Sequence, residues 1–446
     1  MTLISALPQA GTYQVTGSGF RPSAFAVSPL ATASVAGVGL ELSRLIAALG
    51  LTSKQPEVTV DHRLASLWFG WSYRPRDWEA PSVWDAIAGV YETSDGFIRL
   101  HTNLPHHRAA ALRVLGCDAT REAVAAAVKT WDGDALESQV VAEGGASAFM
   151  RSRADWQAHP QGQAVAADPL IGWPAPRSVT VRERPETTAE RPLAGLRVLD
   201  LTRVLAGPVS TRTLAAFGAD VLRIDPPGWD EPGVIPDITP GKRCAFLDLK
   251  TKDGLDHLHA LLAEADVLVH GYRPGALDAL GLDRATRDQL APNRVEVTLD
   301  AYGWQGPWSG RRGFDSLVQM SAGIAATGQD WAGADTPVPL PVQALDHATG
   351  YLMAAAVLSA LANAARGDEV SDGRLSLART AEELAGMTPV EDGGEISKTT
   401  DADFAPTPEH SVWGQTDRLR APLQVGAAHM RWDRPAGPVG TAEARW

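Results

Sequence analysis

A regular alternation of apolar strand segments and helical segments in the middle of the chain constrains its fold most. The stretch at 196–201 reads "LRVLDL", which is typical of a buried strand, and "DVLRID" at 220–225 has the same character. Between them, "GPVSTRTLAAFG" predicts a helix that begins near Gly207 and Pro208 and ends at Gly218. This is a βαβ unit, and because its crossover is right-handed it implies a parallel sheet.

The same alternation continues toward residue 303. Further strands are predicted from "CAFLDL", "DVLVHGY" and "RVEVTLDAYG", with helical pieces between them. The fold class we expect is therefore α/β, with a doubly wound Rossmann-like parallel sheet as the large domain and ligands at the carboxyl ends of its strands. The first strand-to-helix turn reads "TRVLAGP" and lacks G-x-G-x-x-G, which disfavours a plain NAD site.

A second, smaller domain precedes the large one. The stretch "GVYETSDGFIRLHTN" predicts a hairpin that turns at Ser94 to Gly96, and three helical segments follow it. We expect a small α+β domain, with charged or polar linkers on both sides of the large domain. The predicted division of the chain is 1–80, an N-terminal helical segment; 81–176, the small domain; 177–192, a linker; 193–385, the large domain; 386–410, a flexible linker; and 411–446, a closing tail that packs on the large domain.

Charge and cysteine content exclude several functional classes. The 446 residues carry a net charge of −13, so we expect no nucleic-acid partner and no binding to an anionic membrane, both of which need a basic surface. The two cysteines, Cys117 and Cys244, have no partners at metal-ligand spacing, so neither a disulfide framework nor a zinc site is predicted. No apolar run approaches the length of a membrane span, and the first residues do not resemble a secretory signal. We expect a cytoplasmic protein.

A weak internal similarity links the two ends of the chain. A shift of 317 positions places Gly50 on Gly367 and "TVDHRLASL" on "SLARTAEEL", and each segment follows an alanine-rich helix. The same shift places Pro29 opposite Asp346. Chance and a truncated duplication explain this similarity equally well.

Asp346 stands at the start of a long, nearly uncharged helix in "LDHATGYLMAAAVLSAL". An aspartate in this position is most often an N-cap, but the helix N-terminus would also ionise and orient a reactive carboxylate. The adjacent His347 does not face Asp346, and no further ligand lies at i+3 or i+4, so we predict no metal site and a structural hydrogen bond from His347.

Six motifs in sequence resemble those of the family III CoA-transferases, which include formyl-CoA transferase, carnitine CoA-transferases and α-methylacyl-CoA racemase. They are "PLAGLRVLDLTRVLAGPVSTRTLAAFGADVLRIDPPG", "GKRCAFLDLKTKDG", "ADVLVHGYRPGALDALGL", "AYGWQGPW", "RRGFDSLVQMSAG" and "LDHATGYLMAAAVLSAL", and they cover roughly 192–384. The segment from 83 to 176 resembles the small domain of the family, which normally follows the helix after the catalytic aspartate. Here it comes first, as if a truncated copy had been joined to a copy without a small domain.

The resemblance implies an acyl-CoA:carboxylate CoA-transferase in which Asp346 attacks the thioester and forms an acyl-aspartyl anhydride. Its substrates would be an acyl-CoA and a small carboxylic acid, with no tightly bound cofactor and a homodimeric assembly. Charged contacts to CoA are expected from Lys242, Arg243, Arg273 and Arg312, and closer contacts from Leu205, Ala206 and Phe314. For Lys242, a solvated charged edge is an equally good interpretation.

Two other functions remain open. Racemases of the family carry a histidine at the place of Phe314, so one of the two bases for α-epimerisation is missing here and transfer is favoured. A CoA-binding pseudoenzyme would also account for the unusual domain order. Some formyl-CoA transferases also have a run of glycines in the small-domain hairpin, which here has only Gly96.

Overall fold

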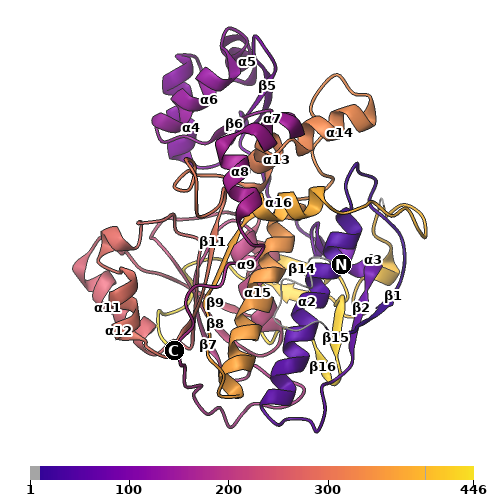
Figure 1. Cartoon of the computed structure of the whole chain (residues 1–446), viewed down its shortest axis with the longest axis vertical. Helices are drawn as coiled ribbons and strands as arrows, with labels where there is room; N and C mark the ends of the chain where they lie inside the picture. The colour runs from indigo at the N-terminus through magenta and orange to yellow at the C-terminus, as the bar shows by residue number, and fades with distance from the viewer. Residues whose placement is uncertain (1–10, 397) are drawn as a thin grey trace.

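The computed structural model describes residues 11–396 and 398–446. The first ten residues of the predicted N-terminal segment, including most of the stretch compared with a secretory signal, and residue 397 of the second predicted linker lie outside the described part. Figure 1 shows a central α/β body with the small domain at one end and the N-terminal segment along one side.

A six-stranded sheet in the order β12-β11-β10-β7-β8-β9 forms the centre, and every neighbouring pair is parallel. The chain runs outward from β7 to β9, returns to β10 on the other side of β7, and continues to β12. The predicted doubly wound parallel sheet is therefore confirmed. The strands are β7 Arg197–Leu201, β8 Asp220–Asp225, β9 Lys242–Phe246, β10 Val267–His270, β11 Val295–Asp300 and β12 Gly373–Ser376.

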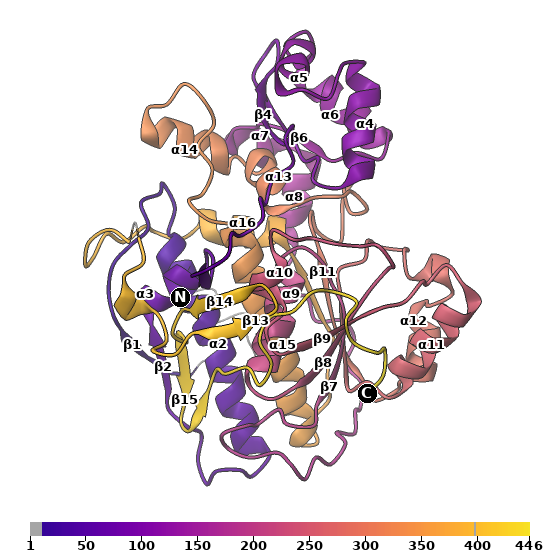
Figure 2. The same ribbon diagram turned by 180° about the vertical axis from the view of Figure 1, so that it is seen from behind.

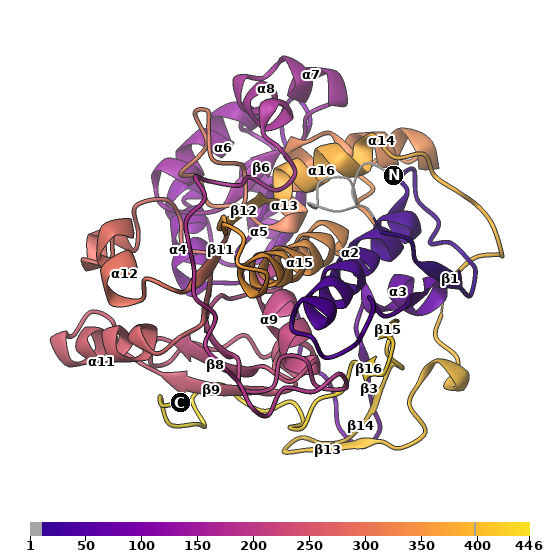
Figure 3. The ribbon, with the colours of Figure 1, turned by 60° about the horizontal axis from the view of Figure 1, so that its bottom comes forward.

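Helices cover both faces of this sheet (Figures 1 and 3). The strands are apolar because both faces are covered; all four residues of β10, for instance, are buried. The helices of the large domain are α9 Ala206–Ala216, α10 Ile235–Ile238, α11 Lys252–Ala263, η1 Asp278–Leu280, α12 Arg284–Leu290, α13 Asp315–Ser321, α14 Ile324–Ala332, α15 Ala344–Ala365 and α16 Leu377–Ala385.

The small domain is an antiparallel sheet, β4-β5-β6, covered by three helices. The predicted hairpin is present, and Thr93 N donates to Gly96 O at its turn. The two short helices α7 and α8 connect the small domain to the large domain and pass near α13 (Figure 1). The elements are β4 Gly89–Glu92, β5 Phe97–Leu100, α4 Pro105–Leu115, α5 Arg121–Val128, α6 Gly133–Ala142, β6 Ser147–Phe149, α7 Arg153–Ala158 and α8 Pro160–Ala167.

The N-terminal segment and the closing tail are interwoven, which the sequence did not predict. Figure 2 shows the tail strands beside the N-terminal segment. Strand β15 pairs with β2, and β14 pairs with β3, so the tail satisfies the open edges of N-terminal strands. The tail also packs on the large domain: Arg431 N donates to Ala216 O, Trp432 Nε1 to Arg212 O, and Ala442 N to Cys244 O. The elements are β1 Gln14–Thr16, α2 Val27–Ala48, β2 Val58–Asp61, α3 His62–Trp68, β3 Tyr73–Pro75, η2 Asp401–Asp403, β13 Glu409–Ser411, β14 Gly414–Arg418, β15 Leu423–Val425 and β16 Ala428–His429.

Helices α2 and α15 lie side by side and match in detail (Figures 1 and 3). Each has 22 residues, and each is entered through a tight turn in which the first helical N–H donates to the carbonyl two residues earlier, at 2.8 Å. Each ends at a glycine with positive φ, Gly50 and Gly367. Pro29 and Asp346 are both third residues of their helices. These shared features support a duplication.

Both helices are long and apolar enough to cross a membrane, although no apolar stretch of that length was expected from the sequence. In each helix, 89% of the most apolar 18-residue stretch is buried inside the protein. Their apolar length is explained by packing against each other and the sheet. A polar contact also joins them: Arg44 Nη1 donates to Asn363 Oδ1 at 3.0 Å and Nη2 to Ser359 Oγ at 2.9 Å.

Candidate active site

A cavity of about 440 Å³ lies at the carboxyl ends of β7, β10 and β11, where the large domain meets the small domain. This is the edge at which parallel sheets that reverse their strand order bind ligands. The lining residues come from the turn after β7, the loops after β10 and β11, the starts of α13 and α15, and the start of α4 in the small domain. Six sequence-predicted residues line it together: Leu205, Ala206, Arg273, Arg312, Phe314 and Asp346.

Asp346 lies in the first turn of α15 and is only 5% exposed. It is not the N-cap, because the cap position is Gln343 and no side chain of that residue caps the helix. Asp315 performs this role from another helix: its Oδ2 accepts N–H groups of Leu345 at 2.9 Å and of Asp346 at 3.0 Å. The interpretation of Asp346 as a cap is therefore wrong.

A hydrogen-bonded chain holds Asp315 in place. Gln319 Nε2 donates to Asp315 Oδ1, and Gln319 Oε1 accepts from Leu340 N at 2.7 Å. Asp315 thus accepts three hydrogen bonds and does not cap its own helix. Its position next to the start of α15 fixes where the Asp346 backbone lies.

The two buried carboxyl groups oppose each other's ionisation. Burial raises the pKa of Asp346 well above its usual range, and the charge of Asp315 raises it further. Burial also raises the pKa of Asp315, to about 6, although its hydrogen bonds act in the opposite direction. The backbone of Ala206, at the start of α9, acts in the opposite direction and lowers the pKa of Asp346. The pair therefore retains a proton close to neutral pH.

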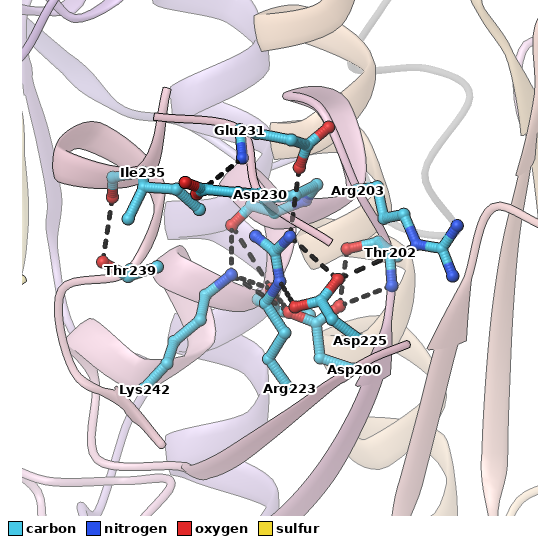
Figure 4. Close-up of polar contacts among 12 residues, drawn as sticks. Asp200, Thr202, Arg203, Arg223, Asp225, Asp230, Glu231, Ile235, Thr239 and Lys242 are labelled. Carbon is cyan, nitrogen blue, oxygen red and sulfur yellow. Dashed lines mark hydrogen bonds and ion pairs between the residues drawn. The ribbon is translucent and has the colours of Figure 1, made fainter. Parts of the chain in front are cut away.

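The turn that brings Ala206 to Asp346 is strained. Val204 has a φ of 66°, which is the only positive φ of a non-glycine residue in the described part of the chain. A β-branched side chain disfavours this conformation. The Val204 N–H donates to both carboxylate oxygens of Glu231, at 3.0 and 3.1 Å. Glu231 accepts in turn from Arg223, which also donates to Asp225 at 2.7 Å (Figure 4).

Lys242 lies among the buried ion pairs near the turn after β7 and does not line the cavity. Its side chain is fully buried, and Nζ donates to Asp200 Oδ2 at 3.0 Å and to Thr211 Oγ1 at 2.6 Å (Figure 4). Arg243 pairs with Asp220 at 2.8 Å, at the amino end of β9. Neither lines the cavity, so the structure does not place these two predicted CoA contacts with the other six. Both stand at the start of β9, whereas the cavity opens at the carboxyl ends of the strands.

Positive charge gathers at the mouth of the cavity. Arg273 and Arg312 have no carboxylate within 4.0 Å among the described residues. Burial lowers the pKa of Arg312, and the neighbouring charge of Arg273 lowers it further. Arg203 lies over the Trp229 ring at 4.3 Å. Unpaired guanidinium groups next to an aromatic surface suit an anionic ligand with a planar part.

Sequence reasoning missed several lining residues. Asp300 ends β11 and accepts N–H groups of Tyr302 at 2.7 Å and Gly303 at 3.1 Å; burial raises its pKa to about 7. Its place after a buried strand was a usable signal. Trp229 and the small-domain residue His107 gave no such signal, because only the fold brings them to the cavity.

His347 does not make the predicted hydrogen bond. Its buried ring stacks on Phe69 with centroids 5.4 Å apart, and Nδ1 has no partner in the described residues. Burial lowers its pKa to about 3, so the ring is neutral. Its role is to pack the start of α15 against the N-terminal segment.

Comparisons with known proteins find similarity to CoA-transferases. Residues 193–413 match the family model described as CoA-transferase family III. A probable fatty acyl-CoA transferase of Mycobacterium tuberculosis is 33% identical over 191 residues, which are 40% of this chain and 48% of that protein. Succinyl-CoA:glutarate CoA-transferase of Mus musculus is 33% identical over 196 residues, 41% of this chain and 44% of that protein.

Formyl-CoA:oxalate CoA-transferase of Escherichia coli is 32% identical over 184 residues, 38% of this chain and 44% of that protein. The chain thus spans less than half the length of each of these three curated relatives. A solved structure of a hypothetical protein from Mycobacterium tuberculosis has 31% identity, a TM-score of 0.39, and coverage of 44% of this chain and 56% of that one.

Proposed function

We propose, on the premise that residues 193–413 belong to CoA-transferase family III, that this protein is an acyl-CoA:carboxylate CoA-transferase with Asp346 as its nucleophile. The relatives named above move CoA between acids, and their names supply the reaction class. The observation that carries the proposal is the position of Asp346: a buried carboxylate that lines the cavity at the edge of the sheet.

The proposed reaction begins when an ionised Asp346 oxygen attacks the thioester carbon. The new C–O bond replaces the C–S bond, so an acyl-aspartyl anhydride forms and CoA leaves as a thiolate. The carboxylate of the acceptor acid then attacks the aspartyl carbonyl carbon of the anhydride. The bond from that carbon to the first acid breaks, the first acid leaves as its carboxylate, and a new acyl-aspartyl anhydride remains. The thiolate then captures the new acyl group, which returns Asp346 to its carboxylate form. Because each step conserves an activated acyl bond, no resident cofactor is proposed, and CoA acts as a substrate.

The placement of CoA follows from the lining of the cavity. We assign its phosphates to Arg273 and Arg312, where guanidinium groups lack carboxylate partners, and its thioester end to Leu205, Ala206 and Phe314. Lys242 and Arg243 are left out, since their charges are already paired. The acceptor is a small carboxylic acid.

The test is the Asp346→Asn variant, which keeps the side-chain shape. Incubation with acyl-CoA and hydroxylamine should trap an acyl hydroxamate with the wild type, and turnover of the variant should fall by about 10⁴-fold or more, as for other nucleophiles. Asp330→Asn, an exposed change on α14, is the matched control. Equal turnover of wild type and Asp346→Asn would exclude the proposal.

The same experiment separates the other two functions. A racemase would incorporate deuterium at the α-carbon of an acyl-CoA without an acceptor acid, and Phe314 gives no imidazole for that step. A pseudoenzyme would bind CoA and give no hydroxamate with any acyl donor.

The assembly and the location are further proposals. The resemblance implies a homodimer. We propose that each chain of it forms a complete catalytic site, because the chain's own small domain lines the cavity together with Asp346. We also propose a cytoplasmic location, which is supported by the burial of both long apolar helices.

A further inference from the structure

The small domain contributes one buried polar side chain to the cavity. Its lining residues are Leu104, His106 and His107, all at the start of α4. His106 is exposed, whereas His107 is 2% exposed. The hairpin turn at Gly96 is not part of the lining. The first turn of α4 and the residue before it are therefore the part of the small domain that faces the cavity.

The ring of His107 has no hydrogen-bond partner. Both Nδ1 and Nε2 are buried, and neither finds a donor or acceptor among the described residues. Buried polar atoms in folded proteins are nearly always paired, and an unpaired group at a cavity wall is available to a ligand. Leu104, the cap residue of α4, offers no side-chain cap to this end of the helix.

Aromatic contacts fix the ring close to the reacting carboxylate. His107 meets the Phe314 ring edge-on, with centroids 5.8 Å apart. Phe314 is in turn held from behind by His101, at 3.7 Å between centroids and 1° between planes. The next residue, Asp315, binds the start of α15 beside Asp346. His107 and Asp346 thus line the same cavity, linked through the neighbouring residues Phe314 and Asp315, although they come from different domains.

The ring is neutral. Burial lowers the pKa of His107 to about 3, and the charges of His106, Arg312 and Arg273 lower it further. A neutral imidazole carries one N–H donor and does not give up its proton in a hydrogen bond. Neutral histidines of this kind polarise carbonyl groups in other enzymes.

We propose that His107 is a further catalytic residue, whose ring N–H binds the carbonyl oxygen of the acyl group as Asp346 attacks it. The inference rests on the proposed function. As the C–O bond to Asp346 forms, the carbonyl electron pair moves to oxygen, and the hydrogen bond from His107 stabilises that charge. When the C–S bond breaks, the pair returns to the carbonyl and the thiolate leaves. No proton is transferred to or from the ring.

The test compares His107→Phe, which keeps a planar ring, with His107→Asn and His107→Gln, which place an amide N–H near the positions of Nδ1 and Nε2. The phenylalanine variant should lower kcat by about 10²–10³-fold, as the loss of one oxyanion donor does elsewhere. The KM for acyl-CoA should stay nearly unchanged, and one of the two amide variants should recover a large part of kcat. His257→Phe, on the exposed face of α11, is the matched control.

Thermal unfolding and calorimetric titration with CoA show whether each variant is folded and binds. A kcat unchanged by His107→Phe, in an enzyme that Asp346→Asn inactivates, would overturn this inference alone. An equal loss in all three His107 variants would assign the ring a packing role and would also overturn it. A wild type without transferase activity would remove the proposed function and this inference together.

Discussion

The two carboxyl groups of Asp315 and Asp346 differ in how well their surroundings accommodate negative charge. Asp315 accepts three hydrogen bonds, two of them from backbone groups of α15, whereas for Asp346 only the backbone of Ala206 lowers the pKa. The carboxylate that accepts more hydrogen bonds holds negative charge more easily, so we expect the proton of the pair to reside preferentially on Asp346. The proposed reaction therefore depends on losing that proton.

Asp346→Asn should stabilise the folded protein at neutral pH. A raised pKa in the folded state means that the native protein holds a proton the unfolded chain has lost, so the free energy of unfolding falls as pH rises through that pKa. Asparagine does not titrate, so the variant does not show this fall in the free energy of unfolding. We expect a gain of at least about 1 kcal/mol at pH 7.5, since one pKa unit corresponds to about 1.4 kcal/mol. Urea unfolding at pH 4.5 and 7.5 measures it; a gain independent of pH would contradict the explanation.

Asp315→Asn should move the pH dependence of catalysis. The charge of Asp315 raises the pKa of Asp346, so its removal should lower that pKa and allow Asp346 to ionise at lower pH. The acidic limb of kcat/KM, which rises as Asp346 loses its proton, should shift to lower pH by about one unit or more. Profiles from pH 4.5 to 8 for wild type and variant test this. A shift to higher pH would show that Asp315 acts chiefly through its hydrogen bonds.

The sequence predicted Asp346 but not its environment. Position at a helix start and the surrounding motif identified the residue, because both are local. The pairing with Asp315 could not be predicted, because it depends on how α13 meets α15 in space. Lys242 shows a second limit of the sequence: its motif suggested a contact with CoA, but the pairing of its charge with Asp200 depends on the fold.

Among the elements, the turn after β7 depends most on its neighbours. Its strained Val204 is held by Glu231, so Glu231→Gln should weaken two hydrogen bonds and leave Arg223 less well paired. We expect a loss of about 1–3 kcal/mol in unfolding free energy and a higher KM for acyl-CoA. Asp230→Asn, an exposed neighbour, is the control. A destabilised variant with unchanged KM would show that the turn does not position CoA.

The contact between α2 and α15 rests on buried charge as well as apolar packing. Arg44 pairs with Glu41 at 2.8 Å and donates to Ser359 and Asn363. Arg44→Met leaves Glu41 buried without a partner and should cost about 3–5 kcal/mol. Adding Glu41→Gln should recover part of the loss, which urea unfolding measures. If the changes in unfolding free energy caused by Arg44→Met and Glu41→Gln simply added, the two residues would not be coupled.

At the scale of the elements, the parallel sheet and the hairpin were predictable because their periodicity and turn residues are local signals. The short strands β1, β2 and β3 were not, since each has only three or four residues and gains its partners from distant segments. The predicted N-terminal helical segment contains the long helix α2, and these short strands lie around it. The matched helices α2 and α15 gave a weak sequence signal that the structure strengthens.

At the scale of the whole molecule, the proposal that each chain forms a complete site predicts activity that does not depend on dimer formation. Specific activity should not change when the protein is diluted through any dimer-to-monomer transition, whose midpoint light scattering determines. The monomer mass is 47.3 kDa. A fall in activity that tracks dissociation would show that a second copy completes the cavity.

The pairing of β15 with β2 has a consequence for biosynthesis. Strand β2 is synthesised long before its partner at Leu423–Val425. The small domain and the central sheet contain their own partners and can form in the meantime during translation. One edge of β2 must stay open until Leu423–Val425 has left the ribosome, and an open edge is a site for wrong pairing. Nascent chains stalled before residue 423 are therefore the species for which a chaperone matters most.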